Sequence, residues 1–297
     1  MSESSFAPVD VVVPHDGIDS ALHFAAREAL LTGRPLRVVG PADLAHGGLV
    51  DRSAGVAELL AGPGVPVDTL VTPTADLGAM LATCADAALV VVHRTSMLHL
   101  MQALSAGEVD DRGFPTVACV PPTWAPRPDE AGPVVVAVDH AFDAAAELLI
   151  GLEQARIHEA PLHLVHAWDL RGPLGPVEDR TLGRLWTAQL AARLREQLEA
   201  LAPGLPVVVD VQRGPATDVV LRAARGGQLL VLGRNPPSPD GRCHLGRTAR
   251  TAIHESHCPV LLTPPLKGDT EVPTARGRTA LPGPRVRRNP ADATPDR

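Results

Sequence analysis

Aromatic side chains are what this sequence of 297 residues has least of. It contains no tyrosine, and phenylalanine and tryptophan together make up 2% of the residues, although 45% of the residues are hydrophobic. Any core must therefore be built from alanine, valine and leucine, which suits helices packed closely on a parallel sheet. The length is sufficient for two domains of ordinary size.

Cysteines are few, and long apolar runs and an excess of positive charge are missing. The four cysteines are Cys84, Cys119, Cys243 and Cys258; they form no CxxC pair, and we interpret them as free thiols in a reducing cytoplasm. No run approaches 18 apolar residues, and the first ten residues lack the pattern of a signal peptide, so neither a membrane span nor secretion is expected. The net charge of -7 argues against nucleic-acid binding by the folded body.

What the sequence does contain is one pattern of strands and helices written twice. Apolar runs typical of buried strands alternate with helical stretches in the same order in both halves. The matched strand segments are 9–13 and 134–138, 35–39 and 161–165, 89–92 and 229–232, and 115–121 and 259–265. This order predicts an α/β fold with two repeated doubly wound parallel-sheet domains, Rossmann-like, each with helices on both faces.

The helices between these strands can be placed from their periodicity. The first helix of each copy starts near Ser20 and near Ala144, and a long amphipathic helix is predicted from Glu178 to Leu201 in the second copy. Third helices are expected at 75–85 and 216–224. Thr74 and Asp218 stand near their starts as predicted caps.

Composition marks the boundaries between these parts. Residues 121–133 contain five prolines and are predicted to form a stiff linker. From residue 266 the chain becomes basic and poor in apolar residues, which predicts a disordered tail. We therefore expect domains at 8–122 and 133–265, a linker at 123–132 and a tail at 266–297.

The segment 229–265 carries the most specific pattern. A buried strand ends at Gly233, a loop follows, a helix opens at Gly246, and the strand Cys258-Pro259-Val260 comes last. This stretch resembles the end of a universal stress protein domain, whose signature is Gly, two residues, Gly, nine residues, Gly and then Ser or Thr. Gly233 and Gly246 fit the first and third glycines, whereas Pro236 and Arg247 replace the second glycine and the Ser or Thr.

The resemblance covers both repeats and implies two adenine nucleotide alpha hydrolase-like domains, the first of them degenerate. It also implies an adenine-nucleotide site, for ATP, in the second domain. There Asp139 would meet the ribose or adenine and Ala167 would offer backbone atoms to adenine. The implied site residues are Asp139, His140, Ala167, Gly233, Gly246, Arg247 and Thr248. Independently of any ligand, Asp139 could equally serve as a helix cap.

Two other groups of residues are predicted to carry no site. In the first copy, His93 and Ser96 replace the first two signature glycines, so nucleotide binding there is not expected. Cys243, His244, His254, His257 and Cys258 fit no closed zinc pattern, so no metal site is expected. Cys258 is predicted to be a small buried thiol in the core.

These observations favour a non-catalytic, stress-response regulatory module with weak or lost nucleotide binding in its second domain. One alternative is a slow ATP hydrolase, for which Asp240 is the single acidic residue inside the loop. Another is a ligand-free interaction scaffold with a protein partner. In the family, the last strands of two domains pair edge to edge. We therefore predict that 116–120 lies beside 260–263, giving a pseudo-dimer within one chain.

Overall fold

The structure is a computed structural model that describes residues 7–12, 19–42, 56, 64–73, 75–97, 99, 100, 102, 115–125, 132–138, 145–168, 176–234 and 245–264. The chain divides into a compact unit, Met1–Lys267, and a separate segment, Gly268–Arg297. The expected tail lies outside the described residues, so everything below concerns the first unit.

The described elements alternate between strands and helices along the chain. In the first half they are β1 (Val9–Val12), α1 (Asp19–Thr32), β2 (Leu36–Pro41), β3 (Val67–Thr72), α3 (Leu77–Ala82), β4 (Leu89–His93), the 3-10 turn η1 (Arg94–Ser96) and β5 (Thr116–Val120). In the second half they are β6 (Val134–Val138), α5 (Ala145–Ile157), β7 (Leu162–Trp168), α6 (Pro176–Leu201), β8 (Val207–Arg213), α7 (Ala216–Ala224), β9 (Leu229–Gly233), α8 (Arg247–Glu255) and β10 (Val260–Thr263).

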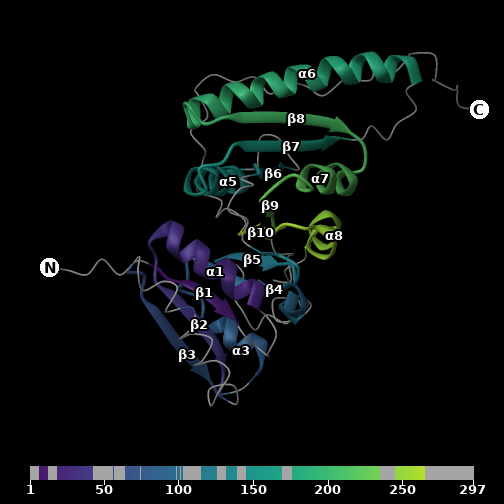
Figure 1. Ribbon diagram of the computed structural model, residues 1–297. Helices are drawn as coiled ribbons and strands as arrows, with labels where there is room; N and C mark the ends of the chain where they lie inside the picture. Colours follow the sequence, from purple (N-terminus) through teal and green to yellow (C-terminus); the bar gives the residue numbers. More distant parts are fainter. Residues whose placement is uncertain are drawn as a thin grey trace, which may run out of the picture. The chain divides into compact units, whose positions relative to one another are not determined.

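All ten of these strands belong to one sheet, in the order β3-β2-β1-β4-β5-β10-β9-β6-β7-β8 (Figure 1). The order on one side of the centre, 3-2-1-4-5, is repeated on the other side as 8-7-6-9-10. Neighbouring strands within each half run parallel, which confirms the predicted doubly wound α/β fold.

The two halves meet where β5 pairs with β10. This pair is antiparallel, with Cys119 opposite Val260, Ala118 opposite Leu261 and Val117 opposite Leu262. The prediction that 116–120 lies beside 260–263 is therefore confirmed. The sheet continues unbroken from one half to the other because each half supplies its last strand as an edge for the other half to pair with.

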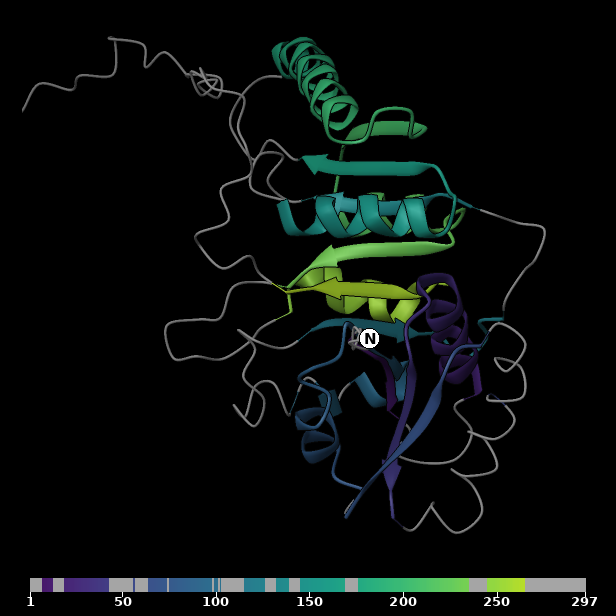
Figure 2. The same ribbon diagram turned by 90° about the vertical axis from the view of Figure 1, so that its left-hand side faces the viewer.

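Side chains alternate across this sheet and form a buried apolar cluster on each face. On one face, Val11 and Val38 pack with α1, and Val136 and Leu164 pack with α5 and α6. The cluster on the opposite face is built with α3, α7 and α8. Figure 2 shows α1 and α5 in front of the strands and α8 behind them. Two layers of helices therefore enclose a sheet whose central strands are apolar on both sides.

The third helices differ from the prediction in different ways: α7 spans Ala216–Ala224 as predicted, whereas α3 spans Leu77–Ala82 instead of 75–85. Helix α3 starts at Leu77 and is capped by Asp76, whose carboxylate accepts from the Ala79 amide at 2.8 Å. Thr74 lies outside the described residues. Helix α7 begins after Pro215, and Asp218 lies inside its first turn, so the prediction that Asp218 caps the helix was wrong. An acidic residue in a first turn still interacts favourably with the positive end of the helix.

In the described part of the chain, no helix is both long and apolar enough to cross a bilayer.

Candidate functional site

The predicted site residues are placed by the ends of parallel strands. Ala167 is the penultimate residue of β7 and Gly233 is the last residue of β9, and both are half-buried. Because β6, β7 and β9 run parallel, their carboxyl ends share one edge of the sheet. Asp139 and His140, which follow β6 directly, lie outside the described residues.

Helix α8 begins at the same part of the fold. Gly246 is its N-cap and, lacking a side chain, supplies no cap to the first-turn N–H groups. Arg247, the first helical residue, is exposed, and Thr248 is half-buried. The helix is anchored by the predicted apolar face: Leu245, Ala249, Ala252 and Ile253 are all buried. A rigid helix start with an exposed guanidinium is suited to contacting an anion.

The side-chain carboxylate of Glu147 occupies the space next to Gly233, and the sequence analysis did not predict this. A Cβ built on Gly233 would lie 1.8 Å from Oε1 of Glu147 and 2.8 Å from its Cδ. Glu147 lies in the first turn of α5 and is half-buried. The glycine that resembles a phosphate-binding position therefore admits a glutamate side chain of the same half.

Glu147 reaches Gly233 because α5 lies very close to the sheet. Gly151, one turn further along α5, faces Val136 of β6 so closely that a Cβ there would lie 2.2 Å from its Cγ2. Residues four apart share a helix face, so Gly151 and Glu147 both point at the sheet. The sequence contained one indication of this contact, the spacing of four between Glu147 and Gly151, which places both on one helix face. This spacing predicts a contact with Gly233 only once the position of α5 against the sheet is known.

Arg234, the next residue after Gly233, contacts the junction of the two halves. It is buried, with 5% of its surface exposed. Its Nε donates to the carbonyl of Thr263 at 3.3 Å, and its Nη2 donates to the carbonyl of Pro115 in the first half at 3.2 Å. The Arg234 guanidinium therefore links the ends of β9 and β10 to the residue that precedes β5.

Of the residues considered as metal ligands, Cys243 and His244 lie outside the described residues. Cys258 is buried, and its amide and sulfur contact the Ser256 hydroxyl at 3.3 Å, which confirms the predicted core thiol. His254 and His257 are exposed. Among the described residues, no three His, Cys, Asp or Glu side chains are grouped as a metal ion would require.

A family model matches the part of the chain that carries this arrangement. Residues 131–264 match the family model described as the universal stress protein family. A universal stress protein domain is therefore found at residues 131–264.

Relatives with the same description match different lengths of the chain. Universal stress protein Rv2624c of Mycobacterium tuberculosis H37Rv is 28% identical over 130 residues, which cover 43% of this chain and 46% of that protein. The chain thus spans about half the length of this relative. Universal stress protein Rv1996 of the same organism is 25% identical over 259 residues, covering 85% of this chain and 73% of that protein.

Solved structures show the fold of the whole unit. A functionally unknown protein, PA1789 from Pseudomonas aeruginosa PAO1, superposes with a TM-score of 0.60 at 18% identity, covering 87% of this chain and 92% of that one. A putative universal stress protein from Pseudomonas aeruginosa UCBPP-PA14 gives 0.60 at 16% identity, with 86% and 92% covered. The fold shared with these proteins extends over both halves of the sheet.

In the first half, a histidine stands at the position equivalent to Gly233 of the universal stress domain. His93 ends β4 there and is buried. Its Nδ1 accepts from the Thr95 amide at 3.3 Å and lies 2.7 Å from the Thr95 hydroxyl. Ser96, at the second signature position, is also buried. A buried imidazole that caps its own turn occupies the place where the signature has a glycine.

Proposed function

We propose that this chain is a non-catalytic regulatory protein of the stress response with one weakened adenine-nucleotide site. The site lies in the universal stress domain, at the edge where β6, β7 and β9 end. Ala167, Gly233, Gly246, Arg247 and Thr248 would form it together with Asp139 and His140. The cytoplasmic location remains a prediction from the unpaired thiols.

The observation that carries the proposal is the Glu147 carboxylate over Gly233. A phosphate group bound at this loop would approach a second negative charge. Two unit charges 4 Å apart repel by about 1 kcal/mol in bulk water and about 4 kcal/mol near a protein surface. A nucleotide therefore binds with its phosphates displaced from Gly233, or binds weakly.

Helix α8 supplies the attraction that opposes this repulsion. Its first-turn N–H groups carry the positive end of the helix dipole, and Arg247 adds an exposed guanidinium that can bind phosphate through two hydrogen bonds. The second glycine and the Ser or Thr of the signature are replaced by Pro236 and Arg247, which removes donors worth on the order of 1 kcal/mol each. The balance favours weak binding at a single site.

Titration calorimetry with ATP tests this proposal. We expect at most one site per chain, and we expect Glu147→Gln to tighten binding by roughly tenfold because it removes the repelling charge and keeps the shape. Asp139→Ala and Gly246→Val should abolish binding. His93→Ala is the matched control in the first half and should leave it unchanged. Two equivalent sites, or weaker binding by Glu147→Gln, would refute the proposed site.

The Glu147 carboxylate is also the one observation that favours a slow ATP hydrolase. A carboxylate beside the phosphates could position water or hold Mg²⁺. Release of inorganic phosphate from ATP with Mg²⁺ separates the two functions. We expect no release above the uncatalysed rate; release that disappears in Glu147→Gln would establish the hydrolase instead. No binding of ATP by any variant would favour a ligand-free scaffold.

We further propose that residues 8–122 are a second, degenerate universal stress domain, so that the chain is a tandem repeat and an internal pseudo-dimer. The mirrored strand order supports this, because 3-2-1-4-5 and 8-7-6-9-10 are the same topology on either side of the β5–β10 pair.

A further inference from the structure

A cavity lies between α6 and β8, on the other side of the strands from α7. It has a volume of about 830 Å³ and is lined by residues including Trp168, Arg184, Ala191, Arg195, Val211 and Arg213. Ligand pockets for small molecules commonly have volumes of 300–1,000 Å³, so this α6–β8 cavity is large enough for one. Its residues are not those of the proposed nucleotide site.

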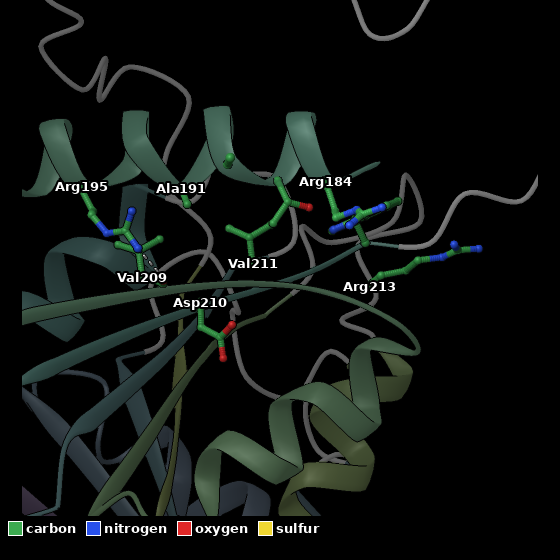
Figure 3. Close-up of a pocket in the computed structure, with 10 residues that line it drawn as sticks. Arg184, Ala191, Arg195, Val209, Asp210, Val211 and Arg213 are labelled. Carbon is green, nitrogen blue, oxygen red and sulfur yellow. Dashed lines mark hydrogen bonds between the residues drawn. The ribbon is translucent and has the colours of Figure 1, made fainter. Parts of the chain in front are cut away.

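The cavity exists because the helix face over the strand is made of small residues. Ala188 and Ala191 of α6 lie over Val209 and Val211 of β8, where larger side chains would fill the gap. Figure 3 shows Val209 and Val211 pointing toward α6. The floor of the cavity is therefore aliphatic.

Positive charge is placed at both ends of this floor. Arg184 and Arg195 lie on α6, and Arg213 ends β8, with its guanidinium carbon 5.8 Å from the centre of the Trp168 ring. Arg184 and Arg195 are eleven residues apart, roughly 16 Å along the helix. Arg195 donates to the carbonyl of Val209 at 3.3 Å. Arg184 and Arg213 thus lie at one end of the α6–β8 cavity, and Arg195 lies at the other.

The acidic residue beside the cavity points to the other side of β8 from α6. Asp210 is the single acidic group among the described lining residues, and Figure 3 shows its side chain pointing away from α6. On that opposite face its Oδ2 accepts from Nε2 of Gln212 at 2.5 Å. The chain as a whole has a net charge of -7, whereas the described lining of this cavity contains three arginines and one aspartate.

We propose that the α6–β8 cavity binds a single-chain organic anion, with its aliphatic body on the valine and alanine floor and its carboxylate or phosphate head group at Arg184 and Arg213. An arginine has five donors and can hold an anion while keeping other contacts. The aliphatic stems of the arginines extend the apolar walls. The binding is independent of the adenine-nucleotide site.

The experiment titrates the full chain with decanoate, decyl phosphate and 1-decanol, followed by calorimetry and by quenching of tryptophan fluorescence, since Trp168 lines the cavity. We expect saturable binding of one anion per chain and binding of 1-decanol that is weaker by roughly tenfold or more, the contribution of one charge-assisted contact. Decanoate and decyl phosphate distinguish the two head groups. Tighter binding of decanoate would indicate a carboxylate ligand, and tighter binding of decyl phosphate would indicate a phosphate ligand.

Variants locate the site. Arg184→Ala and Arg213→Ala should each weaken decanoate binding by roughly fivefold or more, while Arg193→Ala, on α6 outside the lining, should not. Ala191→Leu should fill the floor and abolish binding; Ala188→Leu, at an exposed position, makes the same test if Ala191→Leu fails to fold. Gly246→Val should leave decanoate binding intact. Equal binding of decanol and decanoate, unchanged binding in the filled variants, or no binding would overturn the proposal.

Discussion

Burial sets the chemistry of Cys119, which lies in β5 opposite Val260 at the junction of the two halves. No part of the residue is exposed, and burial raises the pKa of its thiol to about 12, although the nearby Arg94 charge acts in the opposite direction. Burial likewise raises the pKa of Cys84 and of Cys258. At neutral pH all three thiols are protonated and unreactive, as expected of core residues.

Stability should therefore fall in alkaline solution, partly through Cys119. An unfolded thiol ionises near pH 8.5, whereas the folded Cys119 keeps its proton until about pH 12. Between these values the unfolded state binds fewer protons than the folded state, so the free energy of unfolding decreases as pH rises, by up to about 1.4 kcal/mol per pH unit for one thiol. Urea unfolding of the wild type and of Cys119→Ala from pH 7 to 11 measures this. The variant should lose stability less steeply above pH 9, and equal slopes would contradict the assignment.

Residues of the site differ in how far the sequence could predict them. Gly246 of the site could be predicted from local pattern, because a helix start is a feature of consecutive residues, and the same holds for the core thiol Cys258 in its strand-leading Cys-Pro-Val. Glu147 could not be predicted in this way. Its position over Gly233 depends on the close approach of α5 to β6 at Gly151. Gly151 and Val136 are about 15 positions apart in the chain, and Glu147 and Gly233 are more than 80 apart, so neither contact is visible in a local pattern.

At the scale of elements, helix α8 ends on a residue from the other half of the chain. Arg94 follows β4, and its Nη1 donates to the carbonyl of His254 at 3.0 Å, while its Nη2 donates to the carbonyl of Ser256. Carbonyls at a helix C-terminus lack partners within the helix and carry the negative end of its dipole. A guanidinium is well suited to this place because its donors form a planar fork. Burial lowers the pKa of Arg94, so these hydrogen bonds compensate for desolvation.

Removing this contact should destabilise the protein. Arg94→Ala is expected to lower the free energy of unfolding by roughly 1.5–3 kcal/mol, the range for hydrogen bonds to charged groups. Arg94→Lys should recover part of the loss, since a lysine keeps the charge without the fork. Arg250→Ala, at an exposed position on α8 itself, is the control and should change stability by less than about 0.5 kcal/mol. Chemical denaturation gives all three values; a loss in the control as large as in Arg94→Ala would remove the role assigned to Arg94.

The elements themselves were largely predictable, and so were some of their ends: α7 spans the predicted residues 216–224, and α6 ends at Leu201 as predicted. The repeated strand runs gave the strand pairing within each half because parallel strands buried on both faces read as continuous apolar segments. The start of α3 shows the limit. Thr74 and Asp76 are both residues that cap helices, and the choice between them depends on how the chain leaves β3, which single-residue preferences do not encode.

For the whole molecule, the β5–β10 pair is accompanied by side-chain contacts from helix α1 to the second half and to the proline-rich segment between the halves. Nε2 of His158, after α5, lies 2.9 Å from Oε1 of Glu28 in α1, and both side chains are 1% exposed. Nη2 of Arg27 donates to Oε1 of Gln228 at 3.2 Å. Phe24 of α1 packs edge-to-face on Trp124 of the proline-rich segment, with ring centroids 5.2 Å apart. Polar and apolar contacts thus connect the halves in addition to the sheet.

These contacts predict that residues 7–264 unfold as one cooperative unit and that the Glu28–His158 pair couples the halves. Glu28→Leu or His158→Leu alone leaves a buried polar side chain without its neighbour, and we expect each to cost roughly 1–3 kcal/mol, the penalty for an unsatisfied buried polar group. The double variant replaces both partners by apolar groups, so it should be more stable than the sum of the single losses implies. Unfolding followed by tryptophan fluorescence and by far-UV circular dichroism should give one coincident transition in every variant. Two separate transitions, with the first-half substitution shifting just one of them, would show that the halves unfold independently and that the pair does not couple them.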